Sequence, residues 1–245
     1  MPEPIFEGVG VALVSLFDGD DRLLTSETIE HAASLVERGV AAVTVAGTTG
    51  EPWRLDDEDR VALVQACRTS LPRDVPVIAG TGHSDPAKAR DLTARCSAAG
   101  ADAVLVRSPA DAQTIPTFYE QIAQAAAGVP VLAYHFPAFA PPGIGVDELA
   151  DLPVAGIKDS SADADRLAIE IDLCDYAVYT GSANLLSLAG SVGAAGAILA
   201  MANAEPERCV KAFGGDLTAQ AELAAMHLTS MNGFPRGLKA LAGLA

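Results

Sequence analysis

The stretch Val154-Ala155-Gly156-Ile157-Lys158-Asp159-Ser160-Ser161 joins a short apolar run to a cluster of polar residues. Such a run is typical of a buried strand whose last residues reach the edge of a parallel sheet. Partial burial favours the neutral form of an amine, and a neutral lysine can attack a carbonyl group to form a Schiff base. The same pattern fits a lysine that ends a strand and reaches solvent or an ion pair, so this segment alone leaves both interpretations open.

Seven other short apolar runs resemble this one, and stretches with helical spacing of apolar residues lie between them. The runs predict strands at residues 8–16, 41–46, 76–80, 101–106, 130–136, 154–158, 177–180 and 196–200. The intervening stretches predict helices at residues 26–38, 55–70, 86–99, 114–127, 162–173, 184–192 and 206–213. Ser26 is expected to cap the first helix, and Asp85-Pro86 to open the third.

Eight strand–helix units within about 210 residues match the pattern and size of a (β/α)8 TIM barrel. An open doubly wound sheet is the alternative, but no GxGxxG sequence opens a helix after the first strand, which weakens its dinucleotide-binding version. The fifth crossover, residues 146–151, is short. We therefore expect one barrel at residues 1–214, followed within 215–245 by a shortened C-terminal extension of two helices, 217–231 and 235–244, packed on the barrel.

Composition narrows the classes of partner. Sixteen basic residues against 32 acidic ones give a net charge of −16, which argues against nucleic acid and anionic membranes. The acidity fits either a salt-rich cytoplasm or ordinary acidic helix faces. No apolar run reaches the length of a membrane span and no signal peptide is visible, so we expect a cytoplasmic protein. The four cysteines and four histidines lack the spacing of a metal site, and the cysteines are expected to be buried and reduced.

Polar residues follow the expected strands, at the end where barrels carry their active sites. Gly47-Thr48-Thr49-Gly50 offers hydroxyl and backbone N–H groups that suit a small carboxylate, although an ordinary Gly- and Thr-rich turn would look the same. Tyr134 lies in the fifth strand, close to its end; it could shuttle protons beside Lys158 or simply be a buried tyrosine. Alternation along the strand places the next residue, His135, outside the barrel.

Three segments together resemble the signatures of the dihydrodipicolinate synthase / N-acetylneuraminate lyase family. They are Gly47-Thr48-Thr49-Gly50-Glu51, Tyr134-His135-Phe136-Pro137 and Gly156-Ile157-Lys158-Asp159-Ser160, in that family's order and spacing. The region from Gly196 to Asn203 is similar to the family's eighth strand. The resemblance implies a TIM barrel and a class I aldolase or lyase that needs no metal and no cofactor.

The resemblance also implies a role for each matching residue. Lys158 would form a covalent imine with pyruvate or another 2-oxo acid, and Tyr134 would act as the proton shuttle. Thr48 and Thr49 would hold the carboxylate, with Thr49 also relaying protons to Tyr134, and the backbone near Ile198 would line the pyruvate pocket. The other expected substrate contacts are Gly47, Phe139, Ser160 and Gly181.

The chain departs from the synthase pattern at three places. Phe139 stands where the synthases carry an arginine that binds the second substrate, and 108–111 replaces the stretch that holds a tyrosine shared across a dimer interface. The C-terminal tail is also shorter than usual, which puts the usual tetramer in doubt; we expect a homo-oligomer, either a dimer or a tetramer. The stiff apolar loop from Phe139 to Pro142 favours an acceptor without a carboxylate facing it.

These departures favour a 2-keto-3-deoxygluconate aldolase-like enzyme, which cleaves or forms a 2-oxo-3-deoxy acid from pyruvate and an aldehyde. A dihydrodipicolinate synthase-like enzyme and a hydratase-aldolase are the alternatives with the same chemistry. A non-catalytic relative that binds a 2-oxo acid is the alternative from another class, although a pure binder needs no lysine nucleophile.

Overall fold

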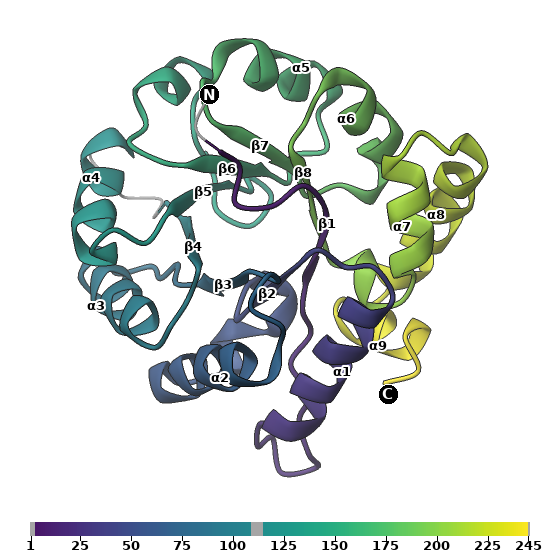
Figure 1. Cartoon of the computed structure of the whole chain (residues 1–245), viewed down its shortest axis with the longest axis horizontal. Coiled ribbons are helices and arrows are strands. Elements are labelled where there is room, and N and C mark those ends of the chain that lie inside the picture. Colours follow the sequence, from purple (N-terminus) through teal and green to yellow (C-terminus); the bar gives the residue numbers. More distant parts are fainter. Residues whose placement is uncertain (1–2, 109–114, 245) are drawn as a thin grey trace.

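The computed structural model describes residues 3–108 and 115–244, and its strands form one closed barrel (Figure 1). Neighbouring strands pair in parallel, and the last strand closes the ring against the first. The strands are β1 (Gly8–Ala12), β2 (Ala42–Val45), β3 (Val77–Gly80), β4 (Ala103–Arg107), β5 (Val131–His135), β6 (Gly156–Asp159), β7 (Ala177–Thr180) and β8 (Gly196–Leu199). The expected (β/α)8 barrel is confirmed.

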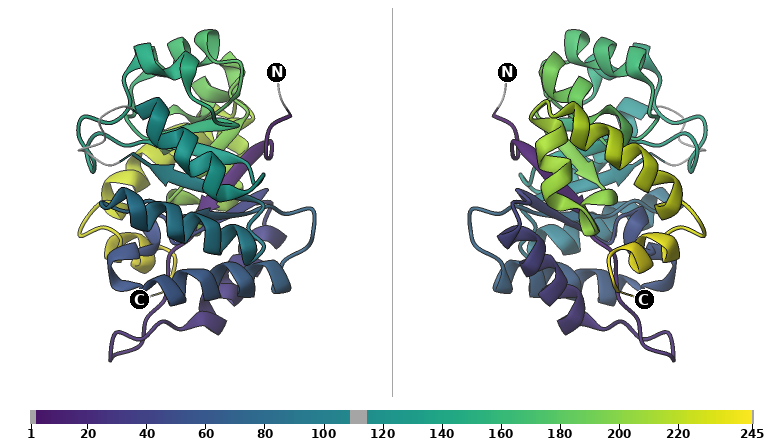
Figure 2. Two further views of the ribbon diagram at one scale, coloured as in Figure 1. Left: turned by 90° about the vertical axis from the view of Figure 1, so that its left-hand side faces the viewer. Right: turned by 90° about the vertical axis from the view of Figure 1, so that its right-hand side faces the viewer.

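Helices surround the barrel and run along its outside (Figures 1 and 2). The α-helices are α1 (Thr25–Glu37), α2 (Asp57–Ser70), α3 (Pro86–Ala98), α4 (Ile115–Ala126), α5 (Ala164–Leu173), α6 (Leu186–Val192), α7 (Pro206–Phe213), α8 (Leu217–Ser230) and α9 (Arg236–Leu241). Short 3-10 helices are η1 (Thr48–Gly50), η2 (Pro52–Arg54), η3 (Val146–Asp151), η4 (Ala183–Leu185) and η5 (Met201–Asn203). The short fifth crossover is η3, as the sequence predicts.

Most element boundaries differ from the sequence predictions by one or two residues, and two of the differences have a clear physical cause. β1 ends at Ala12, because the N–H of Val14 donates to the side-chain oxygen of Asn203 at 3.1 Å instead of to a neighbouring strand. The expected cap at Ser26 is wrong. The N–H of Leu24 donates to Leu16 O at 2.8 Å, and α1 starts directly after Leu24 with no side-chain cap, so Ser26 lies inside the helix.

The barrel interior is filled at its N-terminal end. Inward-facing side chains such as Ile78, Leu132 and Tyr179 form a core that is separate from the core between strands and helices. The segment before β1 runs across this end of the barrel (Figure 1), and the ring of Phe6 stacks on Tyr179 with centroids 4.7 Å apart. Packing at this end leaves the opposite end, where the strands finish, for a binding site.

The two C-terminal helices pack on the barrel. α8 contacts α7 and η4, and α9 contacts α8 and η5 (Figure 2, yellow). Lys239 of α9 forms a salt bridge with Glu51, just after η1. Within the described residues, no helix combines the length and apolarity that a membrane crossing requires. The four cysteines are buried and free, as expected.

Candidate active site

Four long polar side chains stand in one row across four neighbouring strands. Arg107 of β4 is the register partner of Tyr134 on β5, Tyr134 that of Lys158 on β6, and Lys158 that of Tyr179 on β7. Register partners in a parallel sheet point to the same face, and both tyrosines belong to the interior core. The strand ends therefore direct Lys158 into the barrel between two tyrosines.

Lys158 is buried, with 5% of its surface exposed. Its Nζ lies 4.5 Å from the centroid of the Tyr134 ring. No ion pair or hydrogen bond of this amine is found among the described residues. A buried amine without a counter-ion is the environment in which lysine acts as a nucleophile, and it is not that of a strand-end lysine in solvent.

Tyr134 is held from both sides. Its ring stacks with that of Phe136 at 5.8 Å between centroids. Outside the barrel, the hydroxyl of Tyr119 on α4 donates to Val106 O at 2.7 Å and accepts from the Tyr134 N–H at 3.4 Å. Burial raises the pKa of Tyr119, so this phenol stays neutral and acts as a structural link between β4 and β5.

The Gly-Thr-Thr-Gly loop has a fixed and unusual backbone. Ala46, at the end of β2, has a φ of 53°, a conformation that L residues rarely adopt. Gly80 allows this bend, because a Cβ at Gly80 would lie 2.5 Å from Ala46 O. The hydroxyl of Ser15 donates to Gly50 O at 2.8 Å. The loop therefore presents Thr48 at the barrel mouth, where it lines a pocket.

Glu51 fixes the end of this loop. It has a left-handed φ of 53°, and its carboxylate pairs with Arg54 at 3.1 Å and with Lys239 of the C-terminal α9. Both Glu51 and Lys239 are largely buried, with side-chain exposures of 10% and 13%. The C-terminal helix is therefore tied directly to the loop that carries Thr48.

Further expected site residues lie in β8 or in the segments that follow β2, β6 and β7. A Cβ at Gly181 would overlap the hydroxyl of Ser160, at 1.9 Å, so Gly181 is required for this close approach. Ile198 belongs to the interior core, and Thr49 is buried in η1. The pocket at the barrel mouth is lined by none of the expected residues Lys158, Thr49, Ser160, Gly181 and Ile198. Tyr134 lines it, and the ring of Tyr134 lies 4.5 Å from the Lys158 amine.

That pocket has a volume of about 220 Å³. Four of the expected site residues line it: Gly47, Thr48, Tyr134 and Phe139. It also contains residues that sequence reasoning did not select, including Trp53, Arg60, His83 and Arg107. Of these, Arg107 had a usable signal, because it ends an apolar strand as Lys158 does.

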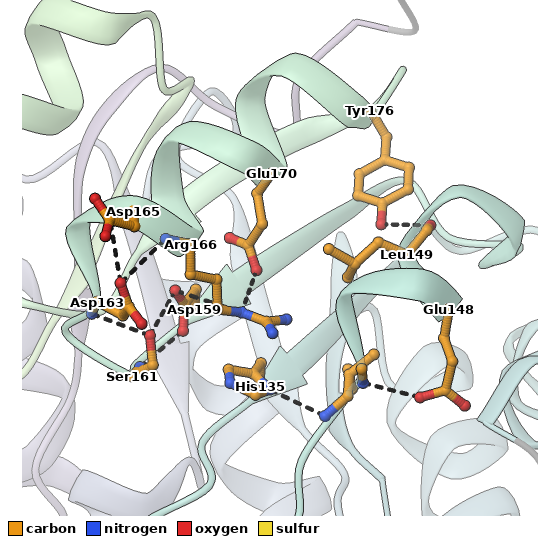
Figure 3. Close-up of polar contacts among 12 residues, drawn as sticks. His135, Glu148, Leu149, Asp159, Ser161, Asp163, Asp165, Arg166, Glu170 and Tyr176 are labelled. Carbon is orange, nitrogen blue, oxygen red and sulfur yellow. Dashed lines mark hydrogen bonds and ion pairs between the residues drawn. The ribbon is translucent and has the colours of Figure 1, made fainter.

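A polar cluster holds β6 from outside the barrel (Figure 3). Ser161 donates to the Asp159 carboxylate through its N–H at 2.7 Å and its hydroxyl at 2.8 Å. Arg166 of α5 donates to Glu170 at 2.8 Å and lies 3.9 Å from Asp159. Burial, and then the nearby Asp159, raise the pKa of Glu170 to about 8. Because Asp159 directly follows Lys158, this cluster fixes the strand end that carries the amine.

In the synthases, the tyrosine shared across the dimer interface is expected at the positions that correspond to residues 108–111 of this chain. Ser108 is buried, with 4% exposure, whereas 109–111 lie outside the described residues.

A TIM barrel with a buried lysine beside a tyrosine, at the strand ends and next to a Gly-Thr-Thr-Gly loop, defines an enzyme of the class I aldolase type. The chain belongs to the dihydrodipicolinate synthetase family, whose model matches residues 5–240. The 4-hydroxy-tetrahydrodipicolinate synthase of Staphylococcus carnosus is 32% identical over 214 residues, covering 82% of this chain and 72% of that protein.

Two other similar proteins widen the range of the family. An uncharacterised DapA-like lyase of Halobacterium salinarum is 34% identical over 212 residues, covering 83% of this chain and 69% of that protein. The crystal structure of YagE, an E. coli K12 prophage protein of the dihydrodipicolinic acid synthase family in complex with pyruvate, superimposes with a TM-score of 0.87 at 25% identity. The match covers 97% of this chain and 88% of YagE.

Proposed function

We propose that this protein is a pyruvate-dependent aldolase or lyase in which Lys158 forms the covalent imine, without metal or cofactor. The observation that carries the proposal is the buried Lys158 amine, 4.5 Å from the ring centroid of Tyr134. The pyruvate complex of YagE supports pyruvate as the 2-oxo acid. Thr48 and Thr49 would hold its carboxylate, and Ser160, Gly181 and Ile198 would surround the imine.

The proposed chemistry begins with attack of the Lys158 amine on the carbonyl carbon of pyruvate. Tyr134 transfers protons so that the carbinolamine oxygen leaves as water, with Thr49 as the relay. The resulting imine withdraws electrons from the adjacent carbon, which loses a proton to become an enamine. The enamine attacks an aldehyde, and hydrolysis of the product imine restores Lys158. In the cleavage direction the same steps run in reverse and release the aldehyde.

Two overall reactions compete within this chemistry. Cleavage or formation of a 2-oxo-3-deoxy acid, as in 2-keto-3-deoxygluconate aldolases, is supported by Phe139 at the position of the synthases' arginine. Synthesis of 4-hydroxy-tetrahydrodipicolinate is supported by the printed name of the S. carnosus relative. The skeleton of that product divides into pyruvate and a four-carbon amino-acid aldehyde, aspartate 4-semialdehyde. The two reactions therefore share the imine and enamine steps and differ in the acceptor and in product release, because the acceptor's amino group, and not water, displaces Lys158 when the ring of this product closes.

Borohydride trapping with pyruvate tests the common step. Intact mass and peptide mapping should locate one adduct on Lys158, and Lys158→Ala should lose both the adduct and turnover. Lys88→Ala is the matched control, because Lys88 is exposed on α3. Saturable pyruvate binding without an adduct would instead indicate a non-catalytic 2-oxo-acid binder. Pyruvate consumption with aspartate 4-semialdehyde, or pyruvate release from 2-keto-3-deoxygluconate, then separates the two reactions.

The proposal includes assembly into a dimer or a tetramer. Light scattering on the purified protein measures the state directly, and a monomer that turns over would remove assembly as a requirement.

A further inference from the structure

The pocket at the barrel mouth contains two arginines and no carboxylate. Arg60 and Arg107 line it, while none of its described lining residues is Asp or Glu. This contrasts with the whole chain, in which acidic residues outnumber basic ones two to one, 32 against 16. A positive pocket in an acidic protein is a specific local arrangement that solubility does not explain.

Neither guanidinium is fully satisfied. Arg60, on α2, is 7% exposed and donates through Nη2 to Pro52 O at 2.6 Å, but its Nε and Nη1 are buried without a hydrogen-bond partner among the described residues. The Nε of Arg107 is likewise buried without a partner there. Buried N–H donors of a charged group are costly to leave unpaired, and a planar guanidinium suits a carboxylate or phosphate well.

The two arginines are close enough to repel each other. Burial lowers the pKa of both; the positive charge of Arg60 lowers that of Arg107 further, whereas the phenol of Tyr134 raises it. The negative charge of Asp57, in the first turn of the same helix, raises the pKa of Arg60. The two side chains form no salt bridge in the described part of the chain. An anion in the pocket would relieve this repulsion and satisfy the free donors together.

Arg107 also changes the meaning of Phe139. The apolar loop alone favours an acceptor without a carboxylate, but the guanidinium of Arg107 lies over the Phe139 ring, with Cζ 4.6 Å from its centroid. Phe139 thus forms one wall of a positively charged pocket. Arg107 is also the register partner of Tyr134, which is next to the imine-forming Lys158.

We infer that Arg60 and Arg107 form an anion subsite beside the imine site, and that the acceptor aldehyde carries a carboxylate or a phosphate group there. This inference rests on the proposed function, because it assigns the acceptor that reacts at Lys158 to the pocket on the other side of Tyr134. In the cleavage direction, the subsite holds the charged end of the 2-oxo acid that is remote from its 2-oxo group. The arginines bind and orient this group, and Lys158 and Tyr134 carry out the bond changes.

Pairs of aldehydes that share a carbon skeleton and differ in the anionic group test the inference. Pyruvate consumption is measured with glyceraldehyde 3-phosphate against glyceraldehyde, and with succinate semialdehyde against butanal. The wild type should prefer at least one anionic aldehyde by about tenfold or more in kcat/KM. Arg107→Met and Arg60→Met should each lower kcat/KM for that aldehyde by about 10- to 100-fold, the scale of a charged hydrogen bond. A preference within the glyceraldehyde pair would indicate a phosphate subsite, and a preference for succinate semialdehyde over butanal would indicate a carboxylate subsite.

Controls separate binding from folding and from imine formation. Arg73→Met, at an exposed arginine outside the pocket, should change nothing, and Arg107→Lys should recover part of the preference. Borohydride trapping with pyruvate is run on every variant. A wild type that traps pyruvate but uses neutral and anionic aldehydes equally would overturn the anion subsite and leave the proposed function intact.

A wild type that traps no pyruvate would overturn the proposed function, and ligand binding would then decide on the subsite. Calorimetric titration with glycerol 3-phosphate, succinate and glycerol measures the subsite without any reaction. Saturable binding of one of the anions, weakened about tenfold or more by Arg107→Met and unaffected by Arg73→Met, supports the subsite. Equal binding to the wild type and Arg107→Met, or no binding to either, refutes it.

Discussion

The Nζ of Lys158 lies 4.5 Å from the centroid of the Tyr134 ring, and the two residues are direct register partners on β6 and β5. This relationship is set by backbone pairing and not by loop conformation, so the two side chains are positioned by the most rigid part of the barrel. Groups that must exchange protons within a reaction benefit from such fixed placement.

Replacing Lys158 with methionine should remove imine formation without harming the fold. Methionine fills a similar volume, and it removes a buried amine that has no partner among the described residues, so the free energy of unfolding should stay equal or rise. Urea denaturation and borohydride trapping of the same preparation measure both effects. An adduct on the Lys158→Met protein, or turnover by it, would contradict the assignment of the nucleophile.

Tyr134→Phe should lower kcat by about 10²-fold or more, because the ring and its packing remain while the proton-transfer group is lost. Steady-state pyruvate consumption gives the rate. Tyr176→Phe is the control: Tyr176 is also buried, but its hydroxyl donates to Leu149 O at 2.9 Å, away from the pocket. An unchanged rate in Tyr134→Phe would reduce Tyr134 to a packing residue.

Much of the fold follows from local pattern. β7 and α7 have the predicted boundaries, 177–180 and 206–213. Gly181 follows β7, Pro206 begins α7 and Gly214 ends it, so Pro and Gly mark these boundaries in the sequence. The end of β1 was missed because its partner is a side chain of Asn203, distant in sequence. The start of α1 was missed because a backbone bond from Leu24 to Leu16, and not the capping preference of Ser26, decides where the helix begins.

The candidate site was predictable where it coincides with strand ends. Lys158 and Tyr134 were found in this way, and Arg107 would have been found had β4 been extended by one residue, since the predicted strand stopped at 106 and the observed strand ends at Arg107. Arg60 carries no comparable signal. It lies within a helix, and only the three-dimensional packing of α2 against the barrel mouth brings its side chain to the pocket.

Breaking the Glu51–Lys239 pair should destabilise the protein and loosen the Gly-Thr-Thr-Gly loop. Lys239→Met leaves the largely buried Glu51 with Arg54 alone, which should cost about 2–4 kcal/mol of unfolding free energy and raise KM for pyruvate. Denaturant unfolding and steady-state kinetics measure the two effects. Lys211→Met, at an exposed lysine on α7, is the control.

A double-mutant cycle separates this pair from other contacts of the two side chains. If the salt bridge matters, the combined loss in Glu51→Gln, Lys239→Met should be smaller than the sum of the single losses. Strictly additive losses would mean that Glu51 and Lys239 act independently, and that α9 does not stabilise the loop through this contact.

The shared position of Glu170 and Asp159 around Arg166 predicts a pH-dependent stability. Burial, then Asp159, raise the pKa of Glu170 to about 8, while Arg166 opposes the shift. The folded protein therefore keeps a proton on Glu170 that the unfolded chain has released above its ordinary value of 4.5. This contribution to stability is fully present below that value and is lost as pH rises towards 8, with a slope of up to about 1.4 kcal/mol per pH unit. Glu170→Gln, which mimics the protonated form, should flatten the decline measured by urea unfolding between about pH 5 and pH 8. Equal slopes in the wild type and Glu170→Gln would mean that Arg166 keeps Glu170 ionised throughout.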